Sequence, residues 1–154
     1  MQFRIAYRIT GLGWSECFVS DETQTCTVTA SYLSDALCHL LLAASAAASL
    51  FGRVTFSFEE EPGEYRWVIT SPRMNEIEVE IIDFDESWSG KPDAAGKSLF
   101  TTTCLPGAFA RAVFNAAQQV LSEHGEAGYA ERWGEHAFPM LQFRELERIL
   151  ALQT

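Results

Sequence analysis

Three glutamates at alternate positions of this 154-residue sequence, Glu76, Glu78 and Glu80, are the side chains best placed to form a binding surface. They alternate with Ile77, Val79 and Ile81, a pattern typical of a half-buried strand. Side chains alternate across a strand, so the three carboxylates share one face at spacings of about 7 Å. This predicts a row of negative charge and not a metal cage. The row is either a solvated sheet face or a docking surface for a basic partner. Four arginines on neighbouring strands are candidates for offsetting its charge: Arg4, Arg8, Arg53 and Arg66.

Asp83, Asp85, Glu86 and Trp88 extend the acidic strand into a polar loop. Alternating carboxylates at a strand end can bind Mg²⁺ or Ca²⁺ through oxygen ligands. The segment 83–90 lacks the third acidic position and the terminal Glu of an EF-hand loop, so we expect no metal and no cofactor. We assign these four residues to the same docking surface, with Trp88 as an aromatic anchor.

The acidic residues are concentrated in one part of the chain. The 28-residue stretch Glu59–Glu86 holds ten of the 21 acidic residues and only two basic ones, Arg66 and Arg73, so it carries −8 of the formal net charge of −10. Such a stretch repels nucleic acid and anionic membranes and steers a basic protein into contact. We therefore expect a basic protein partner, no nucleic acid and no membrane. The chain itself is expected to be a monomer or a homodimer.

No catalytic signature is found. Gly90–Ser98 ends in Gly-Lys-Ser, but it has five residues between its glycines where a phosphate-binding loop has four, and a β-like segment follows it instead of a helix. Cys38 and His39 are adjacent on a predicted helix and point about 100° apart, which does not make a dyad. We expect a protein that is not an enzyme.

The N-terminus alternates apolar and polar residues and does not resemble a signal peptide. The four cysteines show no metal-binding spacing and are interpreted as small buried thiols. A disulfide between Cys17 and Cys26 across a hairpin is the alternative, and it would need an oxidising compartment. A cytoplasmic location follows as the default expectation.

The periodicities predict three strands, a helix, four strands and then further helices. The first helix is expected to begin near Ser31 or Ser34 and to end at Gly52, and it carries no charge after Asp35, which predicts burial on more than one side. The second runs from Pro106 to Gly125, followed by a helical turn over 129–133 and a last helix over 140–152. The expected fold is a single α+β domain over residues 1–154, an antiparallel meander sheet of six to seven strands with helices packed on one face.

Two local details accompany this fold. Glu61-Pro62-Gly63-Glu64 predicts a type II turn with Gly63 at positive φ. The pattern slips at Ile81-Ile82-Asp83, where a bulge would turn Ile82 and Phe84 inward.

Three strings, 31–37 (SYLSDAL), 61–67 (EPGEYRW) and 125–133 (GEAGYAERW) with Phe138-Pro139, resemble a family of small uncharacterised bacterial proteins. The resemblance spans most of the chain and implies no particular activity. In size, acidity and α+β order the chain is also similar to the immunity proteins that neutralise polymorphic bacterial toxins.

The sequence therefore predicts a non-catalytic bacterial interaction protein whose acidic sheet face binds a basic protein, with toxin immunity as one version. The alternative is a small-ligand-binding protein or an enzyme with a pocket between sheet and helices, lined by Tyr7, Phe56, Trp67 and Phe109.

Overall fold

The computed structural model describes residues 2–49, 52–88, 90–134 and 136–153. Its described strands form two antiparallel sheets, which we call sheet A and sheet B. Sheet A has the order β1 (Arg4–Gly11), β2 (Trp14–Ser20), β3 (Thr25–Ser31). Sheet B has the order β4 (Arg53–Glu59), β5 (Glu64–Arg73), β6 (Glu76–Phe84), β7 (Lys97–Cys104). The α+β class is confirmed, but the single meander sheet is wrong, because β3 and β4 are not hydrogen-bonded to each other and the described strands divide into two sheets there.

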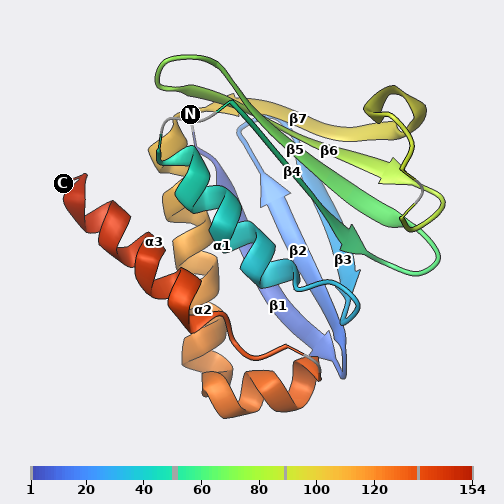
Figure 1. The fold of residues 1–154 in the computed structure, drawn as a ribbon, viewed down its shortest axis with the longest axis vertical. Coiled ribbons are helices and arrows are strands. Elements are labelled where there is room, and N and C mark those ends of the chain that lie inside the picture. Colours follow the sequence, from blue (N-terminus) through green and yellow to red (C-terminus); the bar gives the residue numbers. More distant parts are fainter. Residues whose placement is uncertain (1, 50–51, 89, 135, 154) are drawn as a thin grey trace.

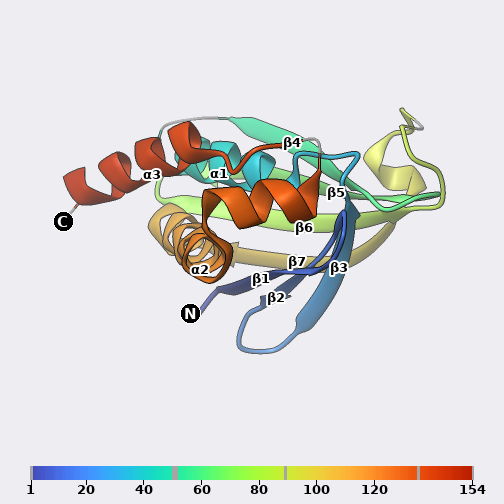
Figure 2. The same cartoon turned by 90° about the horizontal axis from the view of Figure 1, so that it is seen from below.

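The described residues form three α-helices: α1 (Ala36–Ala47) and α2 (Pro106–Trp133) lie on the inner faces of the sheets, and α3 (Met140–Leu152) packs on these two helices. Helix α1 packs against β4 and β5 of sheet B, α2 packs against β1 of sheet A, and α1 also contacts α2 and α3. Figure 1 shows the helices gathered on one side, while the short 3₁₀ helix η1 (Asp93–Ala95) and the β4–β5 turn project at the far end of sheet B. Figure 2 shows the same separation from below.

Helix α1 begins at Ala36 with Asp35 as its N-cap residue, and neither Ser31 nor Ser34 caps it as the sequence had suggested. The Ser34 hydroxyl instead donates to Ser31 O (3.3 Å) and accepts from Glu59 N (3.1 Å), which joins the start of the helix to the end of β4. The helix ends at Ala47, and the expected extension to Gly52 falls partly outside the described residues.

Helix α2 contains a break at Gly125, where the backbone takes φ 66° and ψ 174°. Glycine reaches a positive φ without the steric cost that a Cβ imposes. The expected end of the second helix at this glycine is therefore confirmed as a kink, after which the chain continues helically to Trp133. Beyond the kink, the side chains of Tyr129 and Trp133 are fully buried.

The inner faces of both sheets and the helices share one hydrophobic core. Burial follows the strand alternation, since every second side chain of β6 from Ile77 to Ile81 is inaccessible to solvent. The largest fully buried side chains include Trp67, Phe58, Phe100, Phe109, Leu37, Leu40 and Leu41. The core therefore fills the space between sheets and helices, as a domain of this size can do without metal or disulfide support.

Helix α1 carries buried leucines and an exposed one, and comparing them tests its burial by protein stability. Leu40→Ala removes a fully buried side chain and should lower the free energy of unfolding by about 2–5 kcal/mol. Leu42→Ala, at an exposed position of the same helix, is the matched control and should cost less than about 1 kcal/mol. Urea unfolding of both variants measures the difference. Equal losses would contradict the burial of Leu40 on α1.

Candidate functional site

Strand β6 places Glu76, Glu78 and Glu80 together on the outer face of sheet B, as the alternation predicted; we call them the acidic stripe. The helices cover the opposite face, where Ile77 and Val79 are buried. The stripe is therefore not covered by any described helix, and Glu78 at its centre is exposed.

The strand register sets the immediate neighbours of the stripe. Glu78 lies opposite Thr70 of β5 and Thr103 of β7, and Glu80 lies opposite Val68 and Thr101. Two contacts hold the outer members: Arg73 Nε is 3.5 Å from Glu76 Oε1, and the Ser98 hydroxyl donates to Glu80 Oε2 (2.7 Å). Neither strand places a cation directly opposite Glu78 or Glu80.

The arginines expected to offset the stripe have other partners. Arg53 Nη2 lies 2.7 Å from Asp93 Oδ2, and Arg66 Nη1 donates to Asp93 Oδ1 (3.0 Å) and to Lys91 O (2.6 Å). The hydrogen bond from Arg66, followed by the contribution of Arg53, holds the pKa of Asp93 below its usual value. Arg8 pairs with Glu16 at 3.5 Å.

The loop between β6 and β7 covers the half of the outer face of sheet B that does not carry the acidic stripe. Val68, Ile82 and Phe84 form a small buried cluster there, and the Arg66 guanidinium lies 4.1 Å from the centre of the Phe84 ring. A Cβ at Gly96 would collide with Ile82 and would lie 2.8 Å from Phe84 Cζ, so the loop backbone rests directly on this cluster.

The expected inward turn of Ile82 and Phe84 is therefore wrong. Alternation continues unbroken along β6, and both side chains point outward into the cluster beneath the loop. The register shift lies on β7, where Ile81 pairs with Phe100 and Ile82 with Ser98, which leaves Leu99 as the extra residue. A continuous apolar pattern arises because both faces of the strand are covered at this end.

Exposed carboxylates also meet at the far end of sheet B, where the β6–β7 loop touches the β4–β5 turn. Ser87 N donates to Pro62 O and the Ser87 hydroxyl donates to Gly63 O, each at 2.7 Å. We call the exposed side chains here, Glu61, Asp85 and Glu86, the acidic end. Trp88 projects beside them with 68% of its surface exposed.

The predicted docking residues therefore fall into separate places. The acidic stripe and the acidic end occupy opposite ends of β6, and the covering loop lies between them. Asp83 points to the face opposite the stripe, in register with Tyr65 and Lys97. All seven predicted docking residues were assigned to one surface, because the sequence does not show which half of the outer face the β6–β7 loop covers.

The β4–β5 turn itself differs from the expectation. The Glu61–Pro62 peptide bond is cis and Glu61, not Gly63, has a positive φ of 59°, so a type II turn is wrong. Glycine is still required at position 63, because a Cβ there would collide with Phe84 O. The turn is thus shaped by its contact with the end of β6.

A buried pair of carboxylates, Glu59 and Glu64, was missed by the sequence analysis. The two residues lie directly opposite each other on β4 and β5 and are 5% and 3% exposed. The Ser57 hydroxyl donates to Glu64, whereas Glu59 Oε2 has no hydrogen-bond partner among the described residues. Burial raises the pKa of Glu59, and the neighbouring charge of Glu64 adds to this effect, while Ser87 opposes it.

Residue types able to ligate metals or to carry protons gather at the start of α1. Asp35 Oδ2 lies 3.7 Å from His136 Nδ1, and Cys38 and His39 follow on the helix. Burial, with help from Asp35, raises the pKa of Cys38 to about 11, so the thiol is protonated and a poor nucleophile. The His39 ring stacks on Phe56, and burial lowers its pKa. No three described His, Cys, Asp or Glu side chains are arranged to hold a metal ion.

The expected pocket between sheet and helices is filled by side chains. Phe56 stacks on Trp67 with ring centres 5.5 Å apart, and Phe109 is fully buried against Phe3. Tyr7 is also buried. A groove of about 570 Å³ lies between α2 and sheet A, and of the four residues expected to line a pocket, Tyr7 is among those that line it.

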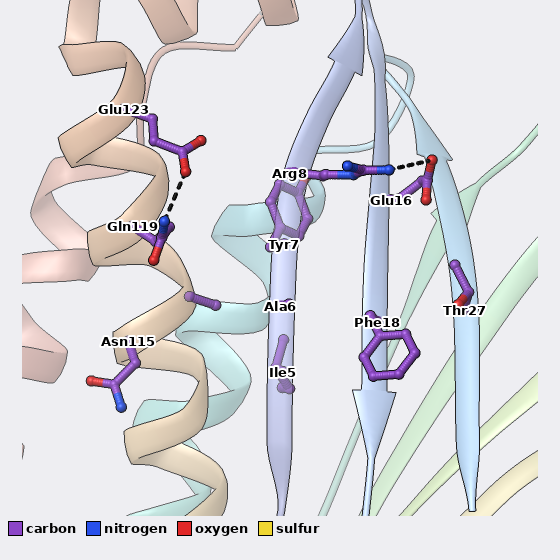
Figure 3. A pocket seen from close by; sticks show the side chains of 11 residues that line it. Ile5, Ala6, Tyr7, Arg8, Glu16, Phe18, Thr27, Asn115, Gln119 and Glu123 are labelled. Carbon is purple, nitrogen blue, oxygen red and sulfur yellow. Dashed lines mark hydrogen bonds and ion pairs between the residues drawn. The ribbon is translucent and has the colours of Figure 1, made fainter.

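Figure 3 shows this groove, with Asn115, Gln119 and Glu123 along α2 and Ala6 and Phe18 on sheet A. Its charged groups are already engaged: Gln119 Nε2 donates to Glu123 (2.8 Å), and Arg8 pairs with Glu16. The groove offers the two amides together with apolar side chains that include Ile5, Ala6 and Phe18.

Comparisons of the chain with family models, with curated proteins and with solved structures found no match. Within the described residues, no helix is both long and apolar enough to cross a membrane.

The loop cover can be tested through Gly96. Gly96→Ala places a methyl group against Ile82 and Phe84, so it should force the loop away and lower the free energy of unfolding by about 1–3 kcal/mol. Gly11→Ala, where a Cβ meets no atom within 4 Å, is the control and should change stability by less than about 0.5 kcal/mol. Thermal and urea unfolding give both values, and an unaffected Gly96→Ala variant would contradict the packing of the loop on sheet B.

The Glu59–Glu64 pair predicts a pH-dependent effect. Because the pKa of Glu59 is raised in the folded state, the unfolded chain loses this proton first as the pH rises, and stability falls until the folded pKa is passed. Glu59→Gln should therefore be close to neutral at pH 4 and should stabilise at pH 8, by about 1.4 kcal/mol for each pKa unit removed. Glu78→Gln, which removes one exposed charge from the same sheet, is the control. Urea unfolding at both pH values measures the effect, and a Glu59→Gln variant that destabilises more at pH 8 than at pH 4 would refute it.

Proposed function

We propose that this protein is a non-catalytic interaction protein that binds a basic protein partner through the acidic outer face of sheet B. The observation that carries the proposal is that two of the three carboxylates of the acidic stripe, Glu78 and Glu80, have no cation opposite them, whereas Glu76 pairs with Arg73. Glu78 and Glu80 face threonines and a valine across the register, and the nearby Arg53 and Arg66 are held by Asp93. On a solvated face with arginines interleaved among the carboxylates, the negative charge would be neutralised and would not attract a basic partner.

The shape of the surface supports a protein partner. Regular strands hold the stripe in a row, so its carboxylates are already positioned before a partner arrives. Clustered like charges accelerate association with a partner of opposite charge and make the rate depend on salt. The acidic end and the exposed Trp88 offer a second contact area beyond the covering loop.

The biological setting belongs to the same proposal. A bacterial cytoplasmic protein that neutralises a basic toxin is one concrete version, consistent with the four free thiols at Cys17, Cys26, Cys38 and Cys104. The protein acts as a monomer or a homodimer. A homodimer through the outer face of sheet B is disfavoured, because two acidic stripes would repel each other.

A second candidate function is binding of a small, neutral, polar ligand in the groove between α2 and β1. The amides of Asn115 and Gln119 beside a floor containing Ala6 and Ala116 favour such a ligand. Thermal stabilisation of the protein by a metabolite, abolished by Asn115→Leu, would support this function instead.

Charge reversal tests the main proposal. The protein is immobilised, proteins of its own host are captured at 50 mM salt, and the captured protein is identified, purified and titrated against variants. We expect Glu76→Lys, Glu78→Lys, Glu80→Lys to weaken binding at least about tenfold, which corresponds to about 1.4 kcal/mol. Binding by the unaltered protein should weaken as salt rises to 300 mM.

Two further triple variants carry the same change in net charge and serve as comparisons. Glu123→Lys, Glu126→Lys, Glu131→Lys alters exposed positions of α2 and should leave the affinity close to that of the unaltered protein. Glu61→Lys, Asp85→Lys, Glu86→Lys reports whether the acidic end takes part. Equal weakening by the α2 variant would mean that net charge alone governs binding, and salt-independent binding would refute the proposal.

A further inference from the structure

Strand β1 is an edge strand of sheet A, and a groove follows its free edge, the side away from β2. The sheet has the order β1-β2-β3, and its other outer strand, β3, contacts β4 and β7 of sheet B. Beside its free edge β1 runs along α2, and Figure 3 shows the groove between the two. A second hollow of about 510 Å³ shares Ile5, Ala6 and Asn115 with the first. Together the two hollows follow β1 from Phe3 to Arg8.

The register of sheet A shows how the backbone of β2 is divided between its two neighbours. In an antiparallel pair, hydrogen-bonded and non-hydrogen-bonded residues alternate, so consecutive residues of a central strand bond to opposite sides. At one end of β2, Gly13 O accepts from Tyr32 N at 2.8 Å. At the other end, Asp21 N donates to Gln24 O at 3.1 Å. The register between these two bonds is regular, so the odd-numbered residues of β2 bond to β3.

The backbone groups that point to the free edge of β1 follow from this division. The even-numbered residues of β2 bond to β1, where they lie opposite Arg4, Ala6 and Arg8. The N–H and C=O groups of Ile5 and Tyr7 therefore point away from β2 and into the groove. Within the described residues, these four groups have no other hydrogen-bond partner. An edge with unpaired groups of this kind is a template for a further strand.

The flank of α2 that faces this edge suits an extended chain. Its small side chains, Ala112 and Ala116, leave room beside β1, and Asn115 and Gln119 carry exposed amides. A strand added at about 4.8 Å from β1 meets unpaired backbone on one side and amides on the other. A small ligand in the same groove could not use the backbone along the whole edge.

The charges along the groove differ between its two ends. Among the described residues that line the hollow near Phe3, Arg4 is the only charged one. At the other end, Arg8 already pairs with Glu16 at 3.5 Å, and Glu123 lines the groove as well. A carboxylate on an added strand is therefore attracted opposite Arg4. A second carboxylate opposite Arg8 would be repelled by the two glutamates.

We propose that the free edge of β1 binds an extended segment of a partner protein, which adds a fourth strand to sheet A. The backbone of the segment pairs with Ile5 and Tyr7, and an acidic side chain lies opposite Arg4. Two residues before it in an antiparallel segment, an apolar side chain faces Ala6 beside the exposed ring of Phe18. This surface lies on a different sheet from the acidic stripe and selects a different partner chemistry.

A second copy of this chain fits the edge less well. If two β1 strands paired antiparallel about Ala6, Arg4 of each copy would lie opposite Arg8 of the other, and like charges directly opposite destabilise a pair. Light scattering on the protein alone tests this occupant. A dimer that an edge-binding peptide dissociates would mean that a second copy fills the groove, which would overturn the proposal.

A displayed library of random eight-residue peptides tests the preference of the edge. We expect selected peptides to carry Asp or Glu two positions after an apolar residue. Arg4→Glu should weaken binding of such a peptide by about three- to tenfold, and replacing the acidic residue of the peptide by Lys should restore it. Arg144→Glu changes the net charge equally at an exposed position of α3 and should leave the affinity unaltered. Fluorescence anisotropy measures both. Selection of no peptide, selection without this pattern, or equal weakening by Arg144→Glu would overturn the proposal.

Methylation of single amide nitrogens in the selected peptide tests strand pairing without altering the protein. Only every second amide of an added strand points to β1. Methyl groups on the residues just before the apolar and just before the acidic residue should weaken binding more than about tenfold, because these amides face Tyr7 and Ile5. Methyl groups on the apolar and acidic residues themselves are the matched controls and should cost much less. Equal sensitivity at both sets of positions would show that the backbone of β1 does not hold the peptide, and the proposal would be wrong.

Discussion

The burial of α1 is the constraint on which the rest of the structure depends. From Ala36 to Ala47 the helix carries no charged side chain, and its apolar residues point in several directions around the axis. Such a helix needs cover on more than one side, and of its leucines Leu42 alone is left exposed. It is covered by β4 and β5 on one side and by α2 and α3 on others. This helix stands between β3 and β4 in the chain, and both sheets contribute their inner faces to the core around it.

Because apolar side chains fill the inner face of sheet B, its polar side chains lie on the outer face. Strand alternation sends the polar residues of sheet B outward, where the β6–β7 loop covers one half and leaves the other open. The polar loop is held over the sheet by ion pairs, since Asp93 of the loop pairs with Arg53 of β4 and with Arg66 of β5. The same two arginines are then unavailable to the acidic stripe. The charge of the open half is thus a consequence of how the covered half is held in place.

The sequence predicted those features that depend on local pattern. The alternation of β6 placed the acidic stripe correctly, Gly125 marked the break in α2, and the lack of charge in α1 indicated its burial. Features that depend on distant contacts were missed. Nothing near Ile82 or Asp83 shows that a loop will cover the outer face there, so the apolar residue was assigned to the wrong side. Glu59 and Glu64 look like any acidic hairpin in sequence, because their burial depends on the approach of Ser87 from a different loop.

The glutamates of sheet B differ in their exposure, and this decides whether their charge can act on a partner. Glu59 and Glu64 are buried, so their charge is costly and cannot be felt by a partner at a distance. Glu76, Glu78 and Glu80 are spaced by about 7 Å along a strand that water reaches, and neighbouring charges at that separation repel by about 0.6 kcal/mol in water. A cationic side chain placed between two of them relieves this repulsion as well as adding attraction. The stripe therefore gains more from a partner with several regularly spaced positive charges than from one isolated charge, which favours an extended basic surface over a single lysine or arginine.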